Sequence, residues 1–95
     1  MPELTPDGHY VVINGRRWRA TDPMIPEAVA AELRVALMDA RRAVGSALKS
    51  GDEAAERAAR DRVQAAKVAL GERGTPWWEQ TDEERAARWS LDTGG

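Results

Sequence analysis

Cysteine and phenylalanine are absent from this 95-residue sequence, and histidine occurs once, as His9. Without cysteine the chain forms no disulfide and offers no thiolate nucleophile or thiolate metal ligand. A single histidine does not make up the ligand set of a transition-metal site. No partner base or nucleophile is marked for His9, so we interpret it as a turn or surface residue. We expect no catalytic residue, no metal and no cofactor, and we predict that the chain is not an enzyme.

Long hydrophobic runs are also absent. No stretch approaches the roughly 20 apolar residues that span a bilayer, and the N-terminal residues, MPELTPDGHY, lack the basic and apolar regions of a secretory signal. The formal net charge of −2 argues against bulk attraction to nucleic acid or to an anionic membrane. We therefore expect a cytoplasmic protein that does not act at a membrane.

Bulky apolar side chains are scarce, and alanine takes their place in much of the chain. Isoleucine occurs only at Ile13 and Ile25. Alanine favours helices but buries little apolar area, so the four tryptophans carry much of the surface available for a core. A chain of this length forms a single domain, residues 1–95, and a core this limited often gains stability from self-association. A homodimer is therefore one expected state.

The clearest local pattern is HYVVINGRRWRA, residues 9–20, which predicts a β-hairpin after a flexible lead-in at residues 1–8. Asn14 and Gly15 favour the type I′ turn, in which both central residues take positive φ. The two-residue turn fixes the register, and alternate residues share a face. One face is predicted to pack on the helices as the core face, and it carries Val11, Ile13, Trp18 and Ala20. The other face carries Tyr10, Val12, Arg17 and Arg19.

Residues 26–71 predict a long antiparallel helical hairpin. In its first half, apolar residues recur in alternating steps of three and four, which is typical of one buried stripe. Gly51 suits a left-handed helix end, and Asp52 is a good cap for a second helix that runs to about Leu70. The short connection makes the two helices antiparallel neighbours. The first stripe consists of Ala30, Leu33, Leu37, Ala40, Val44 and Ala47.

The C-terminal part, residues 75–91, combines adjacent tryptophans with a short helix. Thr81 and Glu84 have the spacing of a capping box, which predicts a helix start. The whole pattern predicts an α+β fold that is mostly helical. Its N-terminal β-hairpin is expected to pack on the long antiparallel helical hairpin, with the short helix added at the C-terminal end.

Two groups of side chains are candidate contact surfaces. The first is basic and aromatic, and it can lie on phosphates and stack on a base, or contact a protein partner. Its alternative is a solvated face whose charges block edge-to-edge strand pairing. This group consists of Tyr10, Arg16, Arg17 and Arg19. The second group is Trp77 and Trp78, which either anchor a partner or cover the open end of the helical hairpin.

Three segments, GRRWRATDPMIPEA, LMDARRAVG and AKVALGERGTPWWE, resemble a family of short bacterial proteins met mostly in actinobacteria. The similarity covers residues from about 9 to 79. Members are sometimes labelled Tol-type biopolymer transporters, but this chain is far too short for the β-propeller of a Tol periplasmic protein. The resemblance implies no activity and no catalytic residue. It implies only that RWRATDP and GERGTPWWE belong to the fold or to a site.

These patterns predict a small non-enzymatic protein-interaction module. It is expected to bind a protein partner or to associate with itself through the helical hairpin. The alternative is a nucleic-acid-binding accessory protein that uses the arginine and tyrosine face of the β-hairpin.

Overall fold

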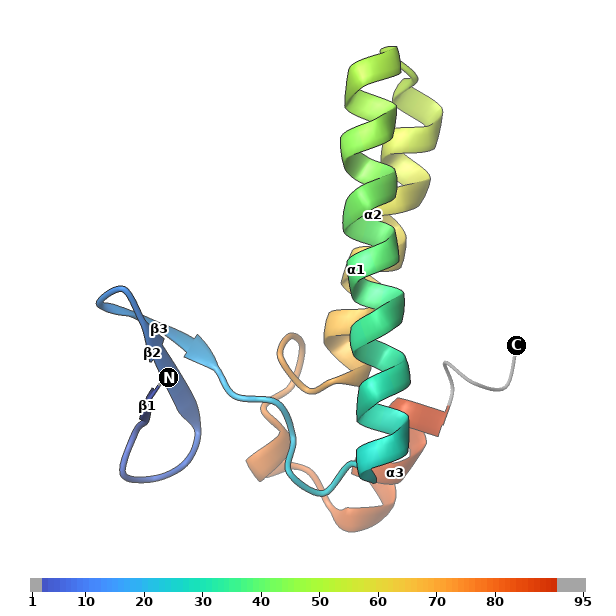
Figure 1. Ribbon diagram of the computed structural model, residues 1–95. Helices are drawn as coiled ribbons and strands as arrows, with labels where there is room; N and C mark the ends of the chain where they lie inside the picture. Colours follow the sequence, from blue (N-terminus) through green and yellow to red (C-terminus); the bar gives the residue numbers. More distant parts are fainter. Residues whose placement is uncertain (1–2, 91–95) are drawn as a thin grey trace.

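The computed structural model describes residues 3–90, with Ser90 described by its backbone alone. A three-stranded antiparallel sheet comes first, followed by two long packed helices and a short C-terminal helix (Figure 1). The predicted α+β class, mostly helical, is confirmed. The strands are β1 (Glu3–Leu4), β2 (Tyr10–Ile13) and β3 (Arg16–Arg19), and the helices are α1 (Glu27–Ser50), α2 (Glu53–Ala69), the 3₁₀ turn η1 (Trp77–Glu79) and α3 (Asp82–Ser90).

The turn between β2 and β3 has the predicted geometry. Asn14 and Gly15 take φ of 51° and 79°, the left-handed conformation that a type I′ turn requires at both central positions. Tyr10 pairs with Arg19, and Ile13 pairs with Arg16, so the predicted register is confirmed. With this register, successive side chains of each strand alternate between the two faces of the sheet.

The segment predicted as a flexible lead-in contains a third strand. β1 pairs antiparallel with β2, on the side away from β3. A tight turn returns the chain: the Gly8 N–H donates to the Thr5 carbonyl at 2.8 Å, and the Thr5 N–H donates to the Tyr10 carbonyl at 2.8 Å. The prediction was wrong for residues 3–4 because that side of β2 has backbone groups that need partners, and a short extended segment supplies them.

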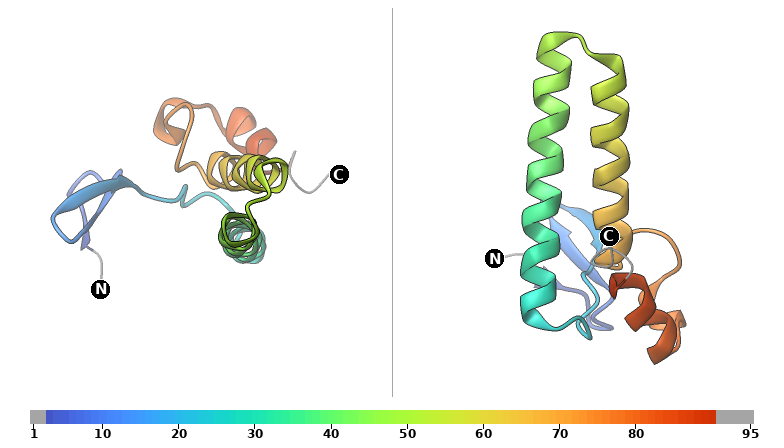
Figure 2. Two further views of the ribbon diagram at one scale, coloured as in Figure 1. Left: turned by 90° about the horizontal axis from the view of Figure 1, so that it is seen from above. Right: turned by 90° about the vertical axis from the view of Figure 1, so that its right-hand side faces the viewer.

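The helices α1 and α2 lie side by side and antiparallel, packed along their alanine-rich stripes (Figure 2). Gly51 takes φ of 71°, and the Asp52 carboxylate accepts a hydrogen bond from the Ala55 N–H at 3.0 Å. Both features confirm the predicted end of the first helix at Gly51 and the predicted start of the second helix after Asp52. The buried residues are Ala30, Leu33, Leu37, Ala40 and Ala47 in α1 and Ala59, Ala66 and Ala69 in α2.

The main core lies at the base of the helical hairpin, at the end away from the loop at Gly51. Trp89 of α3 covers this end and is 8% exposed. The helix that carries it begins with the predicted capping box, since the Thr81 N–H donates to Glu84 Oε1 at 2.8 Å and the Glu84 N–H donates to Thr81 Oγ1 at 3.1 Å. The buried members of this core are Ile25, Ala30, Leu33, Leu37, Ala66, Ala69, Leu70 and Trp89.

Gly71 follows α2 at a point where a side chain has no room. It takes φ of 83°, and an added Cβ would lie 3.1 Å from both Asp22 Cβ and Trp77 Cδ1. We predict that Gly71→Ala lowers the free energy of unfolding by about 3 kcal/mol, because the left-handed backbone disfavours a Cβ and the extra methyl group overpacks the core. Urea unfolding followed by far-UV circular dichroism measures the loss.

Gly51→Ala is the matched control. Gly51 takes φ of 71°, but no atom of the described residues lies within 4 Å of an added Cβ. This variant should therefore lose only the backbone contribution, about 1 kcal/mol. Equal losses in the two variants would contradict close packing around Gly71.

Candidate functional site

The sheet stands beside the helical hairpin and does not close against it. Figure 1 and the view from above in Figure 2 separate the two, with the connector after β3 running between them. The face predicted as the core face lines a hollow shared with the helices, but Ile13 is 42% and Trp18 is 43% exposed. Ala20 of this face is buried as predicted, at 6% exposed, but the prediction was wrong for Ile13 and Trp18 because the facing helix positions include Arg41 and Lys67. Burying these charges against an apolar sheet would cost too much free energy.

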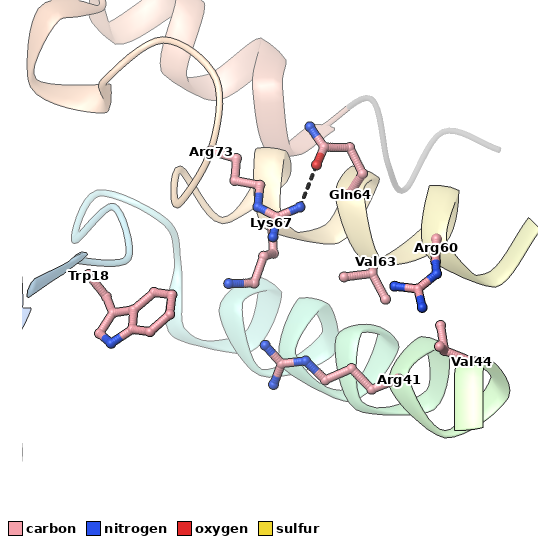
Figure 3. A pocket seen from close by; sticks show the side chains of 8 residues that line it. All are labelled: Trp18, Arg41, Val44, Arg60, Val63, Gln64, Lys67 and Arg73. Carbon is pink, nitrogen blue, oxygen red and sulfur yellow. Dashed lines mark hydrogen bonds between the residues drawn. The ribbon is translucent and has the colours of Figure 1, made fainter. Parts of the chain in front are cut away.

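A groove of about 580 Å³ between the sheet and the helices combines an aromatic ring with positive charges (Figure 3). In Figure 3 the side chains of Arg41 and Lys67 extend from the two helices toward Trp18. Of the described residues that line the groove, four are basic and none is acidic. We name it the basic groove, and it is lined by Trp18, Arg41, Val44, Arg60, Val63, Gln64, Lys67 and Arg73.

A second hollow, of about 350 Å³, continues the basic groove along the sheet. The two share Trp18, Arg41 and Lys67. The acidic side chain of this second part is Glu72, which lies 3.8 Å from the Lys67 ammonium group and accepts a hydrogen bond from the Thr21 hydroxyl at 2.7 Å. Glu72 is therefore engaged with neighbours, and the charge of the continuous depression stays positive.

The cations of the basic groove are only partly neutralised. Arg60 Nε donates to Glu56 Oε2 at 2.7 Å, an ion pair between residues four apart in α2. Arg73 donates to the neutral side chain of Gln64 at 2.6 Å. Within residues 3–90, no carboxylate lies within 4.0 Å of the Arg41 guanidinium. An anionic group entering the groove therefore meets unpaired positive charge.

Two cations hold the ring of Trp18. The Arg16 guanidinium carbon lies 4.7 Å from the ring centroid, and the Lys67 ammonium nitrogen lies 6.0 Å from it. These are cation–π distances, at which the ring quadrupole attracts the charge. The ring is thus oriented by its neighbours while 43% of the residue remains exposed.

The predicted partner anchors, Trp77 and Trp78, join the sheet to the rest of the fold. Trp77 is 7% exposed, and its Nε1–H donates to the Ala20 carbonyl at 2.9 Å. Trp78 is half-buried and stacks on His9, with ring centroids 3.9 Å apart and an angle of 2° between the rings. His9 thus lies in the predicted turn before β2, and its ring packs on Trp78. In the described structure, both tryptophans pack against the sheet and the residues that follow it.

The predicted basic and aromatic group is divided between the two faces of the sheet. Tyr10, Arg17 and Arg19 share one face: the Arg17 guanidinium lies 5.2 Å from the Tyr10 ring centroid, and that of Arg19 lies 5.8 Å from the Trp78 centroid. Arg19 also donates to the Gly74 carbonyl at 2.7 Å, which fixes it to the loop before η1. Arg16 lies on the opposite face, beside the basic groove, because it pairs across the turn with Ile13.

A buried carboxylate fixes the connector between the sheet and α1. Asp22 is 1% exposed and is paired with both Arg85 and Arg88 of α3, with Arg88 Nη2 at 2.5 Å from Asp22 Oδ2. The same carboxylate accepts from the Met24 N–H at 2.8 Å, and the Asp22 N–H donates to the Leu70 carbonyl at 2.9 Å. We name Asp22, Arg85 and Arg88 the Asp22 cluster.

The Asp22 cluster keeps its charges at neutral pH. Burial alone would raise the pKa of the Asp22 carboxyl, but hydrogen bonds from Arg85 and Arg88 outweigh burial and hold this pKa below the ordinary value of 3.8. The hydrogen bond to Asp22 in turn raises the pKa of Arg85. Because all three side chains are also hydrogen-bonded, the buried charge is compensated.

Sequence reasoning missed the groove residues on the helices. No role is predicted from the sequence for Arg41, Arg60, Lys67 and Arg73. A partial signal exists in α2, where Arg60, Gln64 and Lys67 are spaced four and three apart and so lie on one side of the helix. No sequence feature of α2 indicates that this side of the helix faces Trp18, because the position of Trp18 depends on where the connector places the sheet.

Among residues 3–90, no group of three histidine, cysteine, aspartate or glutamate side chains is placed to hold a metal ion. No helix in the part of the chain that the structure describes has the length and hydropathy needed to cross a bilayer.

Comparison with known proteins gives no relative for this chain: no protein-family model, no curated protein and no solved structure matches it. The resemblance to short actinobacterial proteins therefore stays a prediction. Function has to be argued from the basic groove and its surroundings.

The Asp22 cluster predicts a pH dependence of stability. Because the pKa of Asp22 is lowered on folding, its contribution is fully present above the unfolded pKa of about 4 and is lost as the pH falls through the lower folded value. We predict that Asp22→Asn lowers the free energy of unfolding at pH 7 by about 3 kcal/mol, because it leaves two arginines without their carboxylate. The variant should also lose part of the acid sensitivity of the wild type. Thermal unfolding between pH 7 and pH 3 measures both effects.

Asp39→Asn is the control for this experiment. Asp39 pairs with Arg42 at the surface, where its side chain is 48% exposed, so its removal should change stability by no more than about 0.5 kcal/mol. Equal effects of the two substitutions at pH 7 would contradict the role given to the Asp22 cluster.

Proposed function

We propose that this chain is a small non-enzymatic interaction module that acts in the cytoplasm and binds an acidic segment of a protein partner in the basic groove. The observation that carries the proposal is the lining of the groove, in which four basic side chains and no acidic one surround an exposed tryptophan. Tryptophan and arginine are the side chains most enriched among residues that dominate binding energy. A ligand that combines carboxylates with an apolar side chain matches this lining.

The charge distribution supports an acidic segment as the ligand. The whole chain carries a formal charge of −2, so the positive charge of the groove is local. A local positive site on a slightly acidic protein attracts a short anionic segment and repels extended polyanions elsewhere on its surface. Val44 and Val63 add apolar surface between the cations.

Binding without catalysis is supported by where the perturbed groups lie. The pKa of the Asp7 carboxyl and that of the Asp22 carboxyl are lowered, and the pKa of the Arg85 guanidinium is raised. Asp7 accepts hydrogen bonds in the turn after β1, and the other two belong to the Asp22 cluster. Each is used to hold the fold, and none lines the basic groove. Perturbed groups in a cleft are the usual mark of catalytic sites.

Nucleic acid is the second candidate ligand. Trp18 offers an aromatic surface, and Arg16 and Lys67 beside it offer cations, which is the combination that single-stranded nucleic acid binds. The predicted face with Tyr10 and Arg17 points the other way, and a strand would have to pass around the sheet to use both. This division of the cations favours the protein ligand.

Self-association through the helical hairpin has less support. The apolar stripes of α1 and α2 already face each other, and in α1 the large apolar side chains that remain exposed are Val35, Met38 and Leu48. Val35 and Met38 are three apart and so share one side of the helix. Their combined area is small beside the roughly 1,200–2,000 Å² of a stable interface. A homodimer is therefore proposed only as a weak association.

Neutralising two groove cations should weaken binding of an acidic ligand. We predict that the double variant Arg41→Gln, Arg60→Gln binds a labelled peptide that alternates glutamate and valine about tenfold more weakly than the wild type. Each exposed charge contact contributes about 0.7 kcal/mol, and the sum of two corresponds to about a factor of ten. Fluorescence anisotropy of the labelled peptide gives the dissociation constants.

The matched control is Arg42→Gln, Arg62→Gln, which makes the same change in net charge outside the groove. Arg42 is paired with Asp39 on the surface of α1, and Arg62 lines a hollow between the alanines of α1 and α2. This variant should bind within about twofold of the wild type. If both double variants weaken binding equally, the attraction comes from net charge and the groove is not the site. Tighter binding of oligothymidylate than of the peptide would favour the nucleic-acid alternative.

A further inference from the structure

One edge of the sheet is open for pairing. The strand order is β1-β2-β3, so β1 covers one side of β2 and β3 lies at the other edge of the sheet. The Ala20 N–H donates to the His9 carbonyl at 2.9 Å, which makes these two residues a hydrogen-bonded pair. Such pairs alternate along an antiparallel ladder. The backbone groups of Trp18 therefore point toward β2, while those of Arg17 and Arg19 point away from it.

The outward backbone groups are unpaired in this structure. Among residues 3–90, no residue is hydrogen-bonded to the backbone N–H or C=O of Arg17 or Arg19 on the outer side of β3. Arg16, Arg17 and Trp18 are exposed, and Arg19 is half-buried. Residues two apart on a strand are spaced at roughly 6.6–6.8 Å, the repeat that a neighbouring strand needs for pairing. The edge of β3 is thus accessible and has the geometry to add one more strand.

Charge decides which strand fits this edge. β3 has the sequence RRWR, with arginines on both faces. A second copy of β3 would place arginine against arginine, and like charges directly opposite destabilise a sheet. A strand with carboxylates at alternate positions would instead place negative charge across the ladder from Arg16, on the face that borders the basic groove. The outer edge of β3 therefore disfavours pairing with a second copy of β3 and fits an acidic strand.

The basic groove offers further contacts to the side chains of such a strand. The side chains of Arg16 and Trp18 lie on the face that borders the groove, with Arg16 at 4.7 Å over the Trp18 ring. An added strand would turn every second side chain toward this face, because the side-chain period of a strand is two. Carboxylates at those positions reach Arg16 and the cations of the basic groove, and apolar side chains at the alternate positions pack along the methylene groups of Arg17 and Arg19 on the other face.

We propose that the partner is an extended peptide with alternating acidic and apolar residues, which adds to the sheet as a fourth strand beside β3. The inference rests on the proposed function, since it specifies how an acidic segment would be held beside the basic groove. In this mode, main-chain hydrogen bonds supply affinity and the side-chain contacts supply specificity. The outward N–H and C=O groups of Arg17 and Arg19 would form these main-chain bonds.

The direct test is amide hydrogen exchange of the full chain, measured by NMR with and without a saturating peptide that alternates glutamate and valine. Strand addition predicts that exchange of the Arg17 and Arg19 amides slows by at least about tenfold, because they become hydrogen-bonded. The Trp18 amide, which already bonds to β2, serves as the internal reference and should change less. The same peptide with proline at its centre should bind at least about fivefold more weakly, because proline cannot donate to the ladder.

A proline variant of the protein gives a second test. Arg17→Pro removes the outward N–H, and proline is tolerated on an edge strand when its missing N–H would face solvent. Arg17→Gln is the control, because it removes the charge and keeps the N–H. We expect Arg17→Pro to bind the peptide about five- to tenfold more weakly than Arg17→Gln, with both variants keeping the far-UV circular dichroism of the wild type.

The outcomes separate the two proposals. If the peptide binds in a way that depends on Arg41 and Arg60 but leaves the Arg17 and Arg19 amides unprotected, strand addition is wrong and the basic groove remains the binding site. If only oligothymidylate binds, the partner is nucleic acid and both proposals fail. Protection of the Arg17 and Arg19 amides that rises with concentration of the free protein would mean that a second copy occupies the edge, which also overturns the inference.

Discussion

The interaction on which this structure depends is the pairing of the buried Asp22 carboxylate with Arg85 and Arg88. These arginines lie 63 and 66 residues further along the chain, in the last helix. A buried carboxylate is stable only when its charge and its hydrogen-bonding capacity are both met. The same residue bonds through its backbone to the Leu70 carbonyl at the end of α2. The connector, the end of α2 and α3 are therefore held at one point, and everything that precedes the connector is positioned from it.

This constraint explains why the sheet is displaced from the helical hairpin. The chain leaves the Asp22 cluster toward Trp77, whose indole N–H donates to the Ala20 carbonyl, and His9 stacks on Trp78. The sheet is thus attached through one end and through its contact with η1. Its other face is left opposite the cations of α1 and α2, with Trp18 exposed between them. The basic groove stays open in this way, because the sheet does not cover the helices.

The sequence predicted the parts of the fold that depend on local chemistry. Asn14 and Gly15 specified the hairpin register, Gly51 and Asp52 the break between the helices, and Thr81 and Glu84 the start of α3, and all are confirmed. The strand β1 was missed because a two-residue strand has no periodicity to detect. The groove was not predicted because it depends on contacts between distant segments, and nothing in the sequence around Asp22 indicates that it pairs with two arginines of α3. The assumption that Ile13 and Trp18 pack on apolar helix positions failed because Arg41 and Lys67 occupy those positions.

The central claim is that the Asp22 cluster joins the connector to the helical core as one cooperative unit, so that the sheet and the basic groove keep a fixed relation. Native-state hydrogen exchange of the Asp22 amide tests this claim most directly, because that N–H donates to the Leu70 carbonyl at 2.9 Å. The account predicts that this amide exchanges as slowly as the amides of Leu33 and Leu37 in α1, through unfolding of the whole domain. Exchange at the rate of an exposed turn amide such as that of Gly15 would contradict it, because the connector would then open independently of the core.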